Sequence, residues 1–245
     1  MTIPTLKQAL ACARAPWIGA HRGASILFPE NSMAAFQAAI NCGADFLELD
    51  VRLTKDGVPI VIHDESIDRT TSASGLVKDL TYSKIRKAGP IPSLLEVLTS
   101  YGNQVFLNIE LKTSHDTQFL VNEVLNLLFE YGLVERVFLS SFDHSLLRQI
   151  RLQNTDVFIG LLYEEPGLDI LACAGELGTN AIHPYYRLVS RTLASDCHKA
   201  GLKLFPWTVD TAWPLRYLAA VGATGIITNK PDYAANLLPN CIKYQ

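Results

Sequence analysis

Short apolar runs of the kind that form buried strands recur along this chain, and helical patterns separate most of them. Nine such runs begin at Trp17, Phe46, Ile60, Val105, Val137, Val157, Asn180, Lys203 and Gly225. Regular alternation of strands and helices predicts a parallel sheet covered by helices. The length of 245 residues is normal for one (β/α)8 barrel. We therefore expect an α/β fold of the TIM-type (β/α)8 barrel class, with residues 1–245 forming a single domain.

Start and stop signals locate the expected helices. Asn31 or Ser32 opens a helix that ends at Gly43, and Asp116 opens another that ends at Gly132. Further helical patterns cover residues 143–153, 168–177, 190–199, 211–221 and 231–237. Residues 64–92 are polar and rich in turn-forming residues, so we expect a loop there with one short helix near residues 83–87.

The segment between Asp50 and His63 interrupts the alternation, because it is too short to hold a helix. Its centre, Thr54-Lys55-Asp56-Gly57, is typical of a hairpin turn. We expect residues 51–53 and 58–62 to pair as a β-hairpin excursion after the second strand, which leaves eight strands for the barrel. The alternative is that the second arm is itself the third barrel strand. Both interpretations bring His63 close to the end of the second strand.

Composition and charge limit the partners that this chain can have. The formal net charge is −3 and lysine and arginine form no runs, which argues against nucleic acid or an anionic membrane as partner. Residues 1–15 lack the apolar stretch of a signal peptide, and no later run is long enough for a membrane span. The five cysteines are widely spaced with no Cys-x-x-Cys pair, so we expect reduced thiols. These features predict a cytoplasmic protein without stable membrane association.

Acidic residues end two of the predicted strands. Glu48 and Asp50 are two positions apart and share one face of a strand, and Glu110 and Lys112 share one face of a later strand. Because parallel strands end together in a barrel, the three carboxylates should converge, and they repel one another unless a cation joins them. Oxygen ligands favour a hard divalent cation, Mg²⁺ or Ca²⁺. The alternative is an internal salt-bridge network with Lys112 and Arg22.

Histidines and basic residues stand beside these carboxylates. His21 and His63 each end an apolar run, so both should point into the cleft. Such a pair can serve as the acid and the base of phosphodiester cleavage, because imidazole titrates near neutrality. Arg22 and Lys112 can hold and polarise phosphoryl oxygens. Lys112 can equally be a simple partner of Glu110.

Two further residues could line the substrate pocket. His183 ends the run that begins at Asn180, and Trp207 lies within Phe205-Pro206-Trp207-Thr208-Val209. For both, packing in the core is an equally good interpretation. The sequence therefore marks them as candidates only.

A series of motifs in a fixed order closely resembles the glycerophosphodiester phosphodiesterase family, in its short cytoplasmic bacterial form, over about residues 17–235. The motifs are His21-Arg22-Gly23, Pro29-Glu30-Asn31-Ser32, Glu48-Leu49-Asp50-Val51, Thr54-Lys55-Asp56-Gly57, His63-Asp64, Arg69-Thr70-Thr71, Ile91-Pro92-Ser93-Leu94, Glu110-Leu111-Lys112, Ser140-Ser141-Phe142, Trp207-Thr208-Val209 and Gly225-Ile226-Ile227-Thr228.

The resemblance implies a TIM-type barrel that hydrolyses glycerophosphodiesters, small-molecule substrates, to an alcohol and sn-glycerol 3-phosphate. It implies one divalent cation, Mg²⁺ or Ca²⁺ with Mn²⁺ as a further candidate. The expected mechanism is in-line attack by the glycerol 2-hydroxyl after one histidine removes its proton, while the other histidine protonates the departing alcohol. We expect a monomer or a homodimer.

The motif matches assign roles to individual residues. The acid and base match His21 and His63, and the metal ligands match Glu48, Asp50 and Glu110. The phosphate-binding positions match Arg22 and Lys112. Glu30 and Asn31 match a motif at the start of the first barrel helix, where Asn31 is expected to cap the helix and to orient His21.

One motif departs from the family pattern. The family usually ends its last strand with Thr-Asp-x-Pro, whereas this chain has Thr228-Asn229-Lys230-Pro231. Asparagine keeps the size of aspartate but loses its charge. Two other functions remain alternatives: a phosphodiesterase acting on lysophospholipid, and a non-catalytic binder of glycerophosphodiesters on the same barrel.

Overall fold

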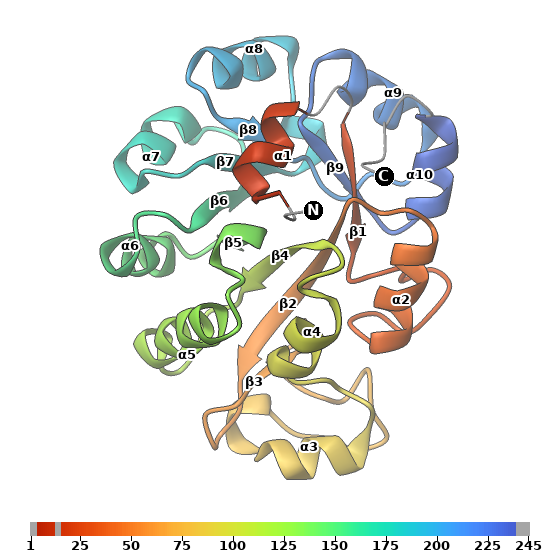
Figure 1. The fold of residues 1–245 in the computed structure, drawn as a ribbon, viewed down its shortest axis with the longest axis vertical. Coiled ribbons are helices and arrows are strands. Elements are labelled where there is room, and N and C mark those ends of the chain that lie inside the picture. The colour runs from red at the N-terminus through yellow and green to blue at the C-terminus, as the bar shows by residue number, and fades with distance from the viewer. Residues whose placement is uncertain (1–3, 13–15, 239–245) are drawn as a thin grey trace.

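The computed structural model describes residues 4–12 and 16–238, and in these residues eight parallel strands form a nearly closed barrel surrounded by helices (Figure 1). The barrel strands are β1 (Trp17–His21), β2 (Phe46–Leu53), β4 (Phe106–Leu111), β5 (Val137–Ser141), β6 (Phe158–Tyr163), β7 (Ala181–Pro184), β8 (Lys203–Leu204) and β9 (Gly225–Thr228). Their order is β8-β7-β6-β5-β4-β2-β1-β9. Between β8 and β9, the Thr224 N–H donates to the Leu204 carbonyl at 2.8 Å and the Ile227 N–H donates to the Pro206 carbonyl at 2.9 Å. The TIM-type barrel predicted from the alternation of strands and helices is confirmed.

The hairpin excursion is also confirmed. The short strand β3 (Pro59–Val61) pairs antiparallel with β2, with Val51 opposite Val61, and it lies outside the barrel path. The alternative, in which this arm is the third barrel strand, is therefore wrong. A small separate core supports the excursion, built from Ile60, Ile62, Ile67, Val77, Ile85 and Ile91.

Helices cover the outside of the barrel, and most of them agree with the expected ranges. They are α2 (Met33–Asn41), α3 (Tyr82–Ala88), α4 (Leu94–Tyr101), α5 (Thr117–Glu130), α6 (His144–Gln153), α7 (Ile170–Leu177), α8 (Arg191–Lys199), α9 (Ala212–Ala220) and α10 (Pro231–Leu237), preceded by α1 (Leu6–Cys12). Short 3₁₀ helices occur at Val77–Asp79, Val134–Arg136 and Tyr186–Leu188. The helices α1 and α4 were not expected. A capping box between Ser93 and Glu96 starts α4, and this S-x-x-E signal is visible in the sequence.

Alternation along the strands divides the apolar residues between two cores. In β2, Leu47 and Leu49 belong to the outer core beneath the helices. Phe46 faces inward and packs against Phe138 and Phe205, with ring centroids 5.0 and 5.7 Å away. Gly19 leaves room for this packing, because a Cβ there would lie 2.2 Å from the Phe46 ring. The aromatic cluster fills the barrel interior below the carboxyl ends of the strands.

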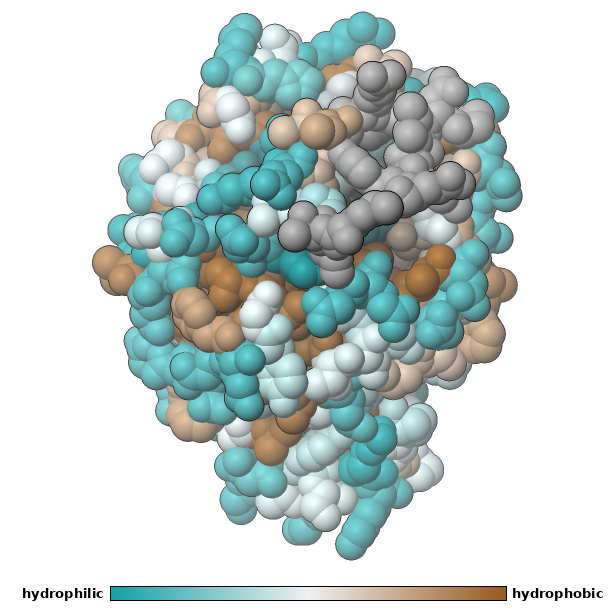
Figure 2. Space-filling model, in the orientation of Figure 1, coloured by the Kyte–Doolittle hydropathy of each residue, from teal (hydrophilic) through white to brown (hydrophobic). Residues whose placement is uncertain are grey.

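Helix α1 closes the amino-terminal end of the barrel. It lies across the barrel opening in Figure 1, and its Leu6, Ala9 and Leu10 join the inner aromatic cluster. Hydrophilic side chains cover most of this end of the molecule, with smaller apolar areas between them (Figure 2). None of the described helices combines the length and the apolarity needed to cross a membrane.

Candidate active site

The strands end around a cavity of about 210 Å³ that collects most of the predicted site residues. Its polar lining consists of His21, Arg22, Glu48, His63, Asn108, Glu110, Lys112 and Glu164. Asp50 is 1% exposed and lies directly behind this lining, where it contacts Arg22 and Lys112. The structure therefore brings together all seven residues expected to act in acid–base chemistry, metal binding and phosphate binding.

Three buried carboxylates stand together on neighbouring strands. In the register between β2 and β4, Asp50 lies opposite Glu110, and Glu48 lies two positions earlier, opposite Asn108. The candidate ligand oxygens of the three lie within 4.8 Å of one another. Burial and the charge of Asp50 raise the pKa of Glu48 well above its usual range, and they raise the pKa of Glu110 to about 7. Carboxylates of this kind lack solvation and favour a cation.

Two basic side chains balance part of this negative charge. Lys112 Nζ lies 2.8 Å from Asp50 Oδ1 and also contacts Glu110, and Arg22 Nε lies 3.1 Å from Asp50 Oδ2. Although burial raises the pKa of Asp50, these two cations hold it at about 2. Three carboxylates face two cations, so a divalent cation bound by oxygen ligands fits the donor set.

The loop after β1 places the Arg22 guanidinium beside Asp50. Arg22 and Asn31 have φ angles of 56° and 55°, the left-handed region that residues other than glycine rarely adopt. The Asn31 N–H donates to the Arg22 carbonyl at 2.9 Å, and the Arg22 N–H donates to Glu48 Oε2 at 3.0 Å. This tight loop therefore connects the end of β1 to a carboxylate of β2.

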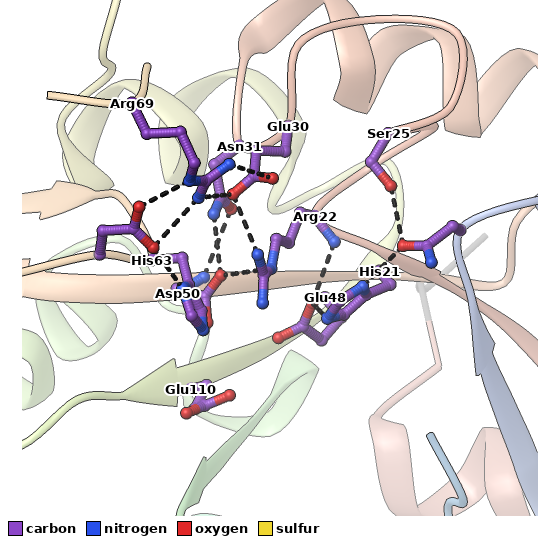
Figure 3. A network of polar contacts seen from close by, with 12 residues as sticks. His21, Arg22, Ser25, Glu30, Asn31, Glu48, Asp50, His63, Arg69 and Glu110 are labelled. Carbon is purple, nitrogen blue, oxygen red and sulfur yellow. Dashed lines mark hydrogen bonds and ion pairs between the residues drawn. The ribbon is translucent and has the colours of Figure 1, made fainter. Parts of the chain in front are cut away.

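Asn31 does not cap helix α2, and the expectation that it would is wrong. The cap is Ser32, whose hydroxyl accepts a hydrogen bond from the Ala35 N–H at 3.2 Å. The Asn31 side chain is 5% exposed and instead donates to Asp50 Oδ2 at 2.8 Å (Figure 3). The left-handed backbone turns this side chain toward the carboxylates rather than toward the helix amides.

His21 is oriented by Asn229, not by Asn31. Its Nδ1 lies 2.7 Å from Asn229 Oδ1. The Asn229 amide group donates to Asp210 Oδ2 at 2.6 Å, which directs the carboxamide oxygen toward the imidazole. Nδ1 of His21 therefore carries the proton. Nε2 is unprotonated and lies 4.0 Å from Glu48 Oε2.

The electrostatic surroundings keep His21 neutral. Burial and the nearby positive charge of Arg22 lower the pKa of His21 to about 4. The amide of Asn229 carries no charge that could stabilise an imidazolium. His21 therefore presents an unprotonated nitrogen to the cavity at neutral pH.

His63 is held by a chain of charged residues that ends at Arg22. Its Nδ1 lies 2.7 Å from Asp64 Oδ1, and Asp64 accepts two hydrogen bonds from Arg69, at 2.6 and 3.1 Å. Arg69 donates two more to Glu30, at 2.9 and 2.8 Å, and Glu30 pairs with Arg22 at 3.0 Å (Figure 3). Glu30 thus supports the site from outside the cavity. Burial lowers the pKa of His63, and Asp64 opposes that shift.

Of the two residues expected either to line the pocket or to pack in the core, His183 lies in the core and Trp207 lines the cavity. His183 is fully buried, neither ring nitrogen has a hydrogen-bond partner in the described residues, and it packs against Phe205 at 5.1 Å between ring centroids. It does not line the cavity, so the core interpretation holds for this residue. Burial lowers the pKa of its imidazole to about 3. Trp207 does line the cavity, and its indole N–H donates to the His183 carbonyl at 2.8 Å.

Sequence reasoning missed several residues at the site. Phe142, Leu162 and Glu164 line the cavity, and Asp210 and Arg69 hold other site residues in place. The first three sit at or just beyond the ends of β5 and β6, where alternation of inward positions could have indicated them. Asp210 lies outside any strand, and no local signal identifies its role.

Comparison with known proteins agrees with this geometry. The family model of the glycerophosphoryl diester phosphodiesterase family matches residues 21–233. A glycerophosphodiester phosphodiesterase of Caldanaerobacter subterraneus is 41% identical over 233 residues, which cover 89% of this chain and 96% of that protein.

Solved structures show the same fold. A glycerophosphodiester phosphodiesterase from Agrobacterium tumefaciens has a TM-score of 0.80 at 27% identity, covering 91% of this chain and 98% of that one. An Oleispira antarctica phosphodiesterase, solved in complex with the product sn-glycerol-3-phosphate, has a TM-score of 0.83 at 23% identity and covers 91% and 96%. The second likeness concerns the fold alone.

Proposed function

The chain belongs to the glycerophosphoryl diester phosphodiesterase family and is an enzyme of that kind, and on this premise we propose that it hydrolyses glycerophosphodiesters to an alcohol and sn-glycerol 3-phosphate with a divalent cation and two histidines. The observation that carries the proposal is one cavity lined by two imidazoles, two basic groups and buried carboxylates. Binding alone does not require an acid and a base on the same cavity. Hydrolysis of a phosphodiester requires both.

Glu48, Asp50 and Glu110 would hold the cation. Their oxygen donors suit Mg²⁺ or Ca²⁺, and Mn²⁺ is a further candidate. When bound, such a cation supplies positive charge that stabilises phosphoryl oxygens and lowers the pKa of a coordinated hydroxyl. The raised pKa values of Glu48 and Glu110 support this assignment, because they mark carboxylates whose charge is incompletely compensated.

His21 is proposed as the base. Its Nε2 is unprotonated because Nδ1–H is donated to the Asn229 carboxamide, so it can accept the proton of the attacking glycerol 2-hydroxyl. His63 is proposed as the acid that protonates the departing alcohol. Its partner Asp64 is an anion in direct contact with the ring, which stabilises an imidazolium, whereas the partner of His21 is an uncharged amide.

Arg22 and Lys112 are proposed to hold the phosphoryl oxygens. Both line the cavity and both already pair with Asp50, so their positions are fixed before substrate arrives. Their carboxylate pairing and their proposed phosphate binding are compatible, because each cation has further N–H groups to donate.

The deciding experiment is a coupled assay for glycerol 3-phosphate released from glycerophosphocholine and glycerophosphoethanolamine, with and without EDTA. We expect EDTA to abolish activity, and we expect His21→Ala and Glu48→Ala to lower kcat by roughly 10²- to 10⁴-fold. His115→Ala is the matched control, because His115 is exposed and lies outside the cavity. Undiminished activity in either site variant would overturn the proposal. If an analogue lacking the 2-hydroxyl were cleaved at the normal rate, the nucleophile would be water rather than that hydroxyl.

We also propose that the chain acts in the cytoplasm as a single catalytic domain, without stable membrane association, as a monomer or a homodimer. Free thiols support a reducing compartment, since Cys12, Cys42, Cys173 and Cys197 are unpaired in the described residues. Cys241 lies outside the described residues.

A further inference from the structure

One part of the cavity wall differs from the rest in its chemistry. The side proposed to face the phosphate comes from the ends of β1, β2 and β4 and carries Arg22, Glu48, Glu110 and Lys112. The side that comes from the ends of β5, β6 and β8 carries Phe142, Leu162, Glu164 and Trp207. We call these four residues the head-group wall.

The two aromatic rings of the head-group wall contact each other and are held in place by their neighbours. Phe142 and Trp207 meet edge to face, with ring centroids 5.6 Å apart and an interplanar angle of 89°. The hydrogen bond from the Trp207 indole to the His183 carbonyl fixes one ring, and Tyr185 packs behind it at 5.8 Å between ring centroids. Phe142 is 40% exposed, so its ring is available to a ligand.

Glu164 is the charged member of the wall. It is exposed and, among the described residues, it makes no hydrogen bond or ion pair. The other two carboxylates that line the cavity, Glu48 and Glu110, face Arg22 and Lys112. The head-group wall therefore combines aromatic faces with a negative charge that no basic side chain in residues 4–12 and 16–238 balances.

This combination matches one end of the proposed substrate better than the other. The glycerol part is an uncharged polyol, and its hydroxyls suit the polar wall around Asn108 and the carboxylates. A polyol against Phe142 and Trp207 would lose hydrogen bonds to water without replacing them. An ammonium group gains from aromatic faces and from a nearby carboxylate at the same time.

We propose that the head-group wall binds the leaving alcohol and selects cationic amino alcohols, with the ammonium group placed against the rings of Phe142 and Trp207 and beside the Glu164 carboxylate. This inference rests on the proposed function, because it assumes that the phosphodiester lies between His21 and His63. Neutral head groups bind without the charge interactions and are therefore cleaved less efficiently.

The test compares two substrates that differ only in charge. One is sn-glycero-3-phosphocholine, and the other is its neutral isostere, the glycerophosphodiester of 3,3-dimethylbutanol, in which carbon replaces nitrogen. We expect kcat/KM to be about tenfold higher for the choline ester, the scale of a partly exposed cation–π contact with an added carboxylate. Glu164→Gln and Phe142→Leu should each reduce this ratio to less than about threefold. Glu165→Gln is the matched control, because Glu165 is the exposed neighbour that does not line the cavity.

The outcomes separate this inference from the proposed function. Equal kcat/KM values for the two substrates in an active wild-type enzyme would overturn the head-group inference and leave the hydrolase intact. A fall in the ratio with Glu165→Gln as large as that with Glu164→Gln would also overturn it, because the effect would then come from the general surface charge. Failure to cleave any glycerophosphodiester would overturn the proposed function itself.

Discussion

Replacing Glu110 by glutamine should stabilise the metal-free protein at neutral and alkaline pH. Glu110 is 7% exposed, and its burial beside Asp50 raises its pKa from an ordinary value of 4.5 to about 7. Each unit of pKa shift corresponds to about 1.4 kcal/mol, so ionised Glu110 costs the folded state about 3 kcal/mol. Glutamine keeps the shape of the side chain and removes this charge.

The difference in stability between the wild type and Glu110→Gln depends on pH. Between about pH 4.5 and 7, the unfolded chain loses the Glu110 proton while the folded chain keeps it, so the stability of the wild type falls as pH rises through this interval. Glu110→Gln does not titrate here. The two proteins should therefore have nearly equal stability at about pH 4, and the variant should be about 3 kcal/mol more stable at about pH 8.

Thermal unfolding in EDTA measures this difference. For a chain of this size, about 3 kcal/mol corresponds to a rise in Tm of roughly 6 to 12 °C at pH 8. Added Mg²⁺ should raise the Tm of the wild type and reduce or remove the advantage of the variant, because the cation compensates the carboxylate. Glu176→Gln on α7 is the control, since this exposed glutamate undergoes the same change of charge. Identical Tm values at pH 8, or the same offset at pH 4 and pH 8, would refute the reasoning.

Three further substitutions test other parts of the structure. Arg69→Lys removes the paired hydrogen bonds to two carboxylates, so kcat should fall roughly tenfold to a hundredfold with a smaller change in KM, and unchanged steady-state kinetics would argue against a positioning role. Asn229→Asp places a carboxylate beside Nδ1 of His21, which favours the imidazolium, so the acid limb of the pH profile of kcat/KM should move up by about one unit; a profile that stays in place would contradict this. Gly160→Ala puts a Cβ 2.4 Å from Nε2 of His183. Urea unfolding should show a loss of about 1 to 3 kcal/mol, whereas a variant of wild-type stability would show that the buried imidazole can move.

The alternation of strand-like runs with helical patterns, together with the chain length, was sufficient to predict the barrel, because the spacing of apolar residues in each run is a local property of the sequence. Alternation of side chains along a strand placed Glu48 and Asp50 on one face, and the short span up to His63 indicated the hairpin. Helix α4 could also have been predicted, because the capping box that begins at Ser93 is visible in the sequence. Local pattern therefore explains the fold and the cluster of carboxylates at the site.

The hydrogen bonds that position His21 and His63 could not be predicted from local spacing. His21 and Asn229 are 208 positions apart, and Glu30 and Arg69 are 39 apart. Neither pair follows from spacing, since each depends on how loops from different strands meet above the barrel. The misassigned cap has a related cause. Asn31 and Ser32 are both good N-cap residues, and only the left-handed backbone at Asn31 decides between them.

The residue after β9 that contacts the ring of His21 is asparagine, where the family motif given in the sequence analysis usually has aspartate. Asn229 contacts His21 directly, but its amide group and its backbone N–H are both held by the carboxylate of Asp210, at 2.6 and 2.8 Å. The negative charge thus stands one residue further from the imidazole, with a neutral carboxamide between them. A carboxylate in direct contact would favour protonated His21, whereas the carboxamide fixes the orientation of the ring and leaves it neutral. The carboxamide therefore positions the ring of His21, and the neutral ring supports the proposal that His21 acts as the base rather than as the acid.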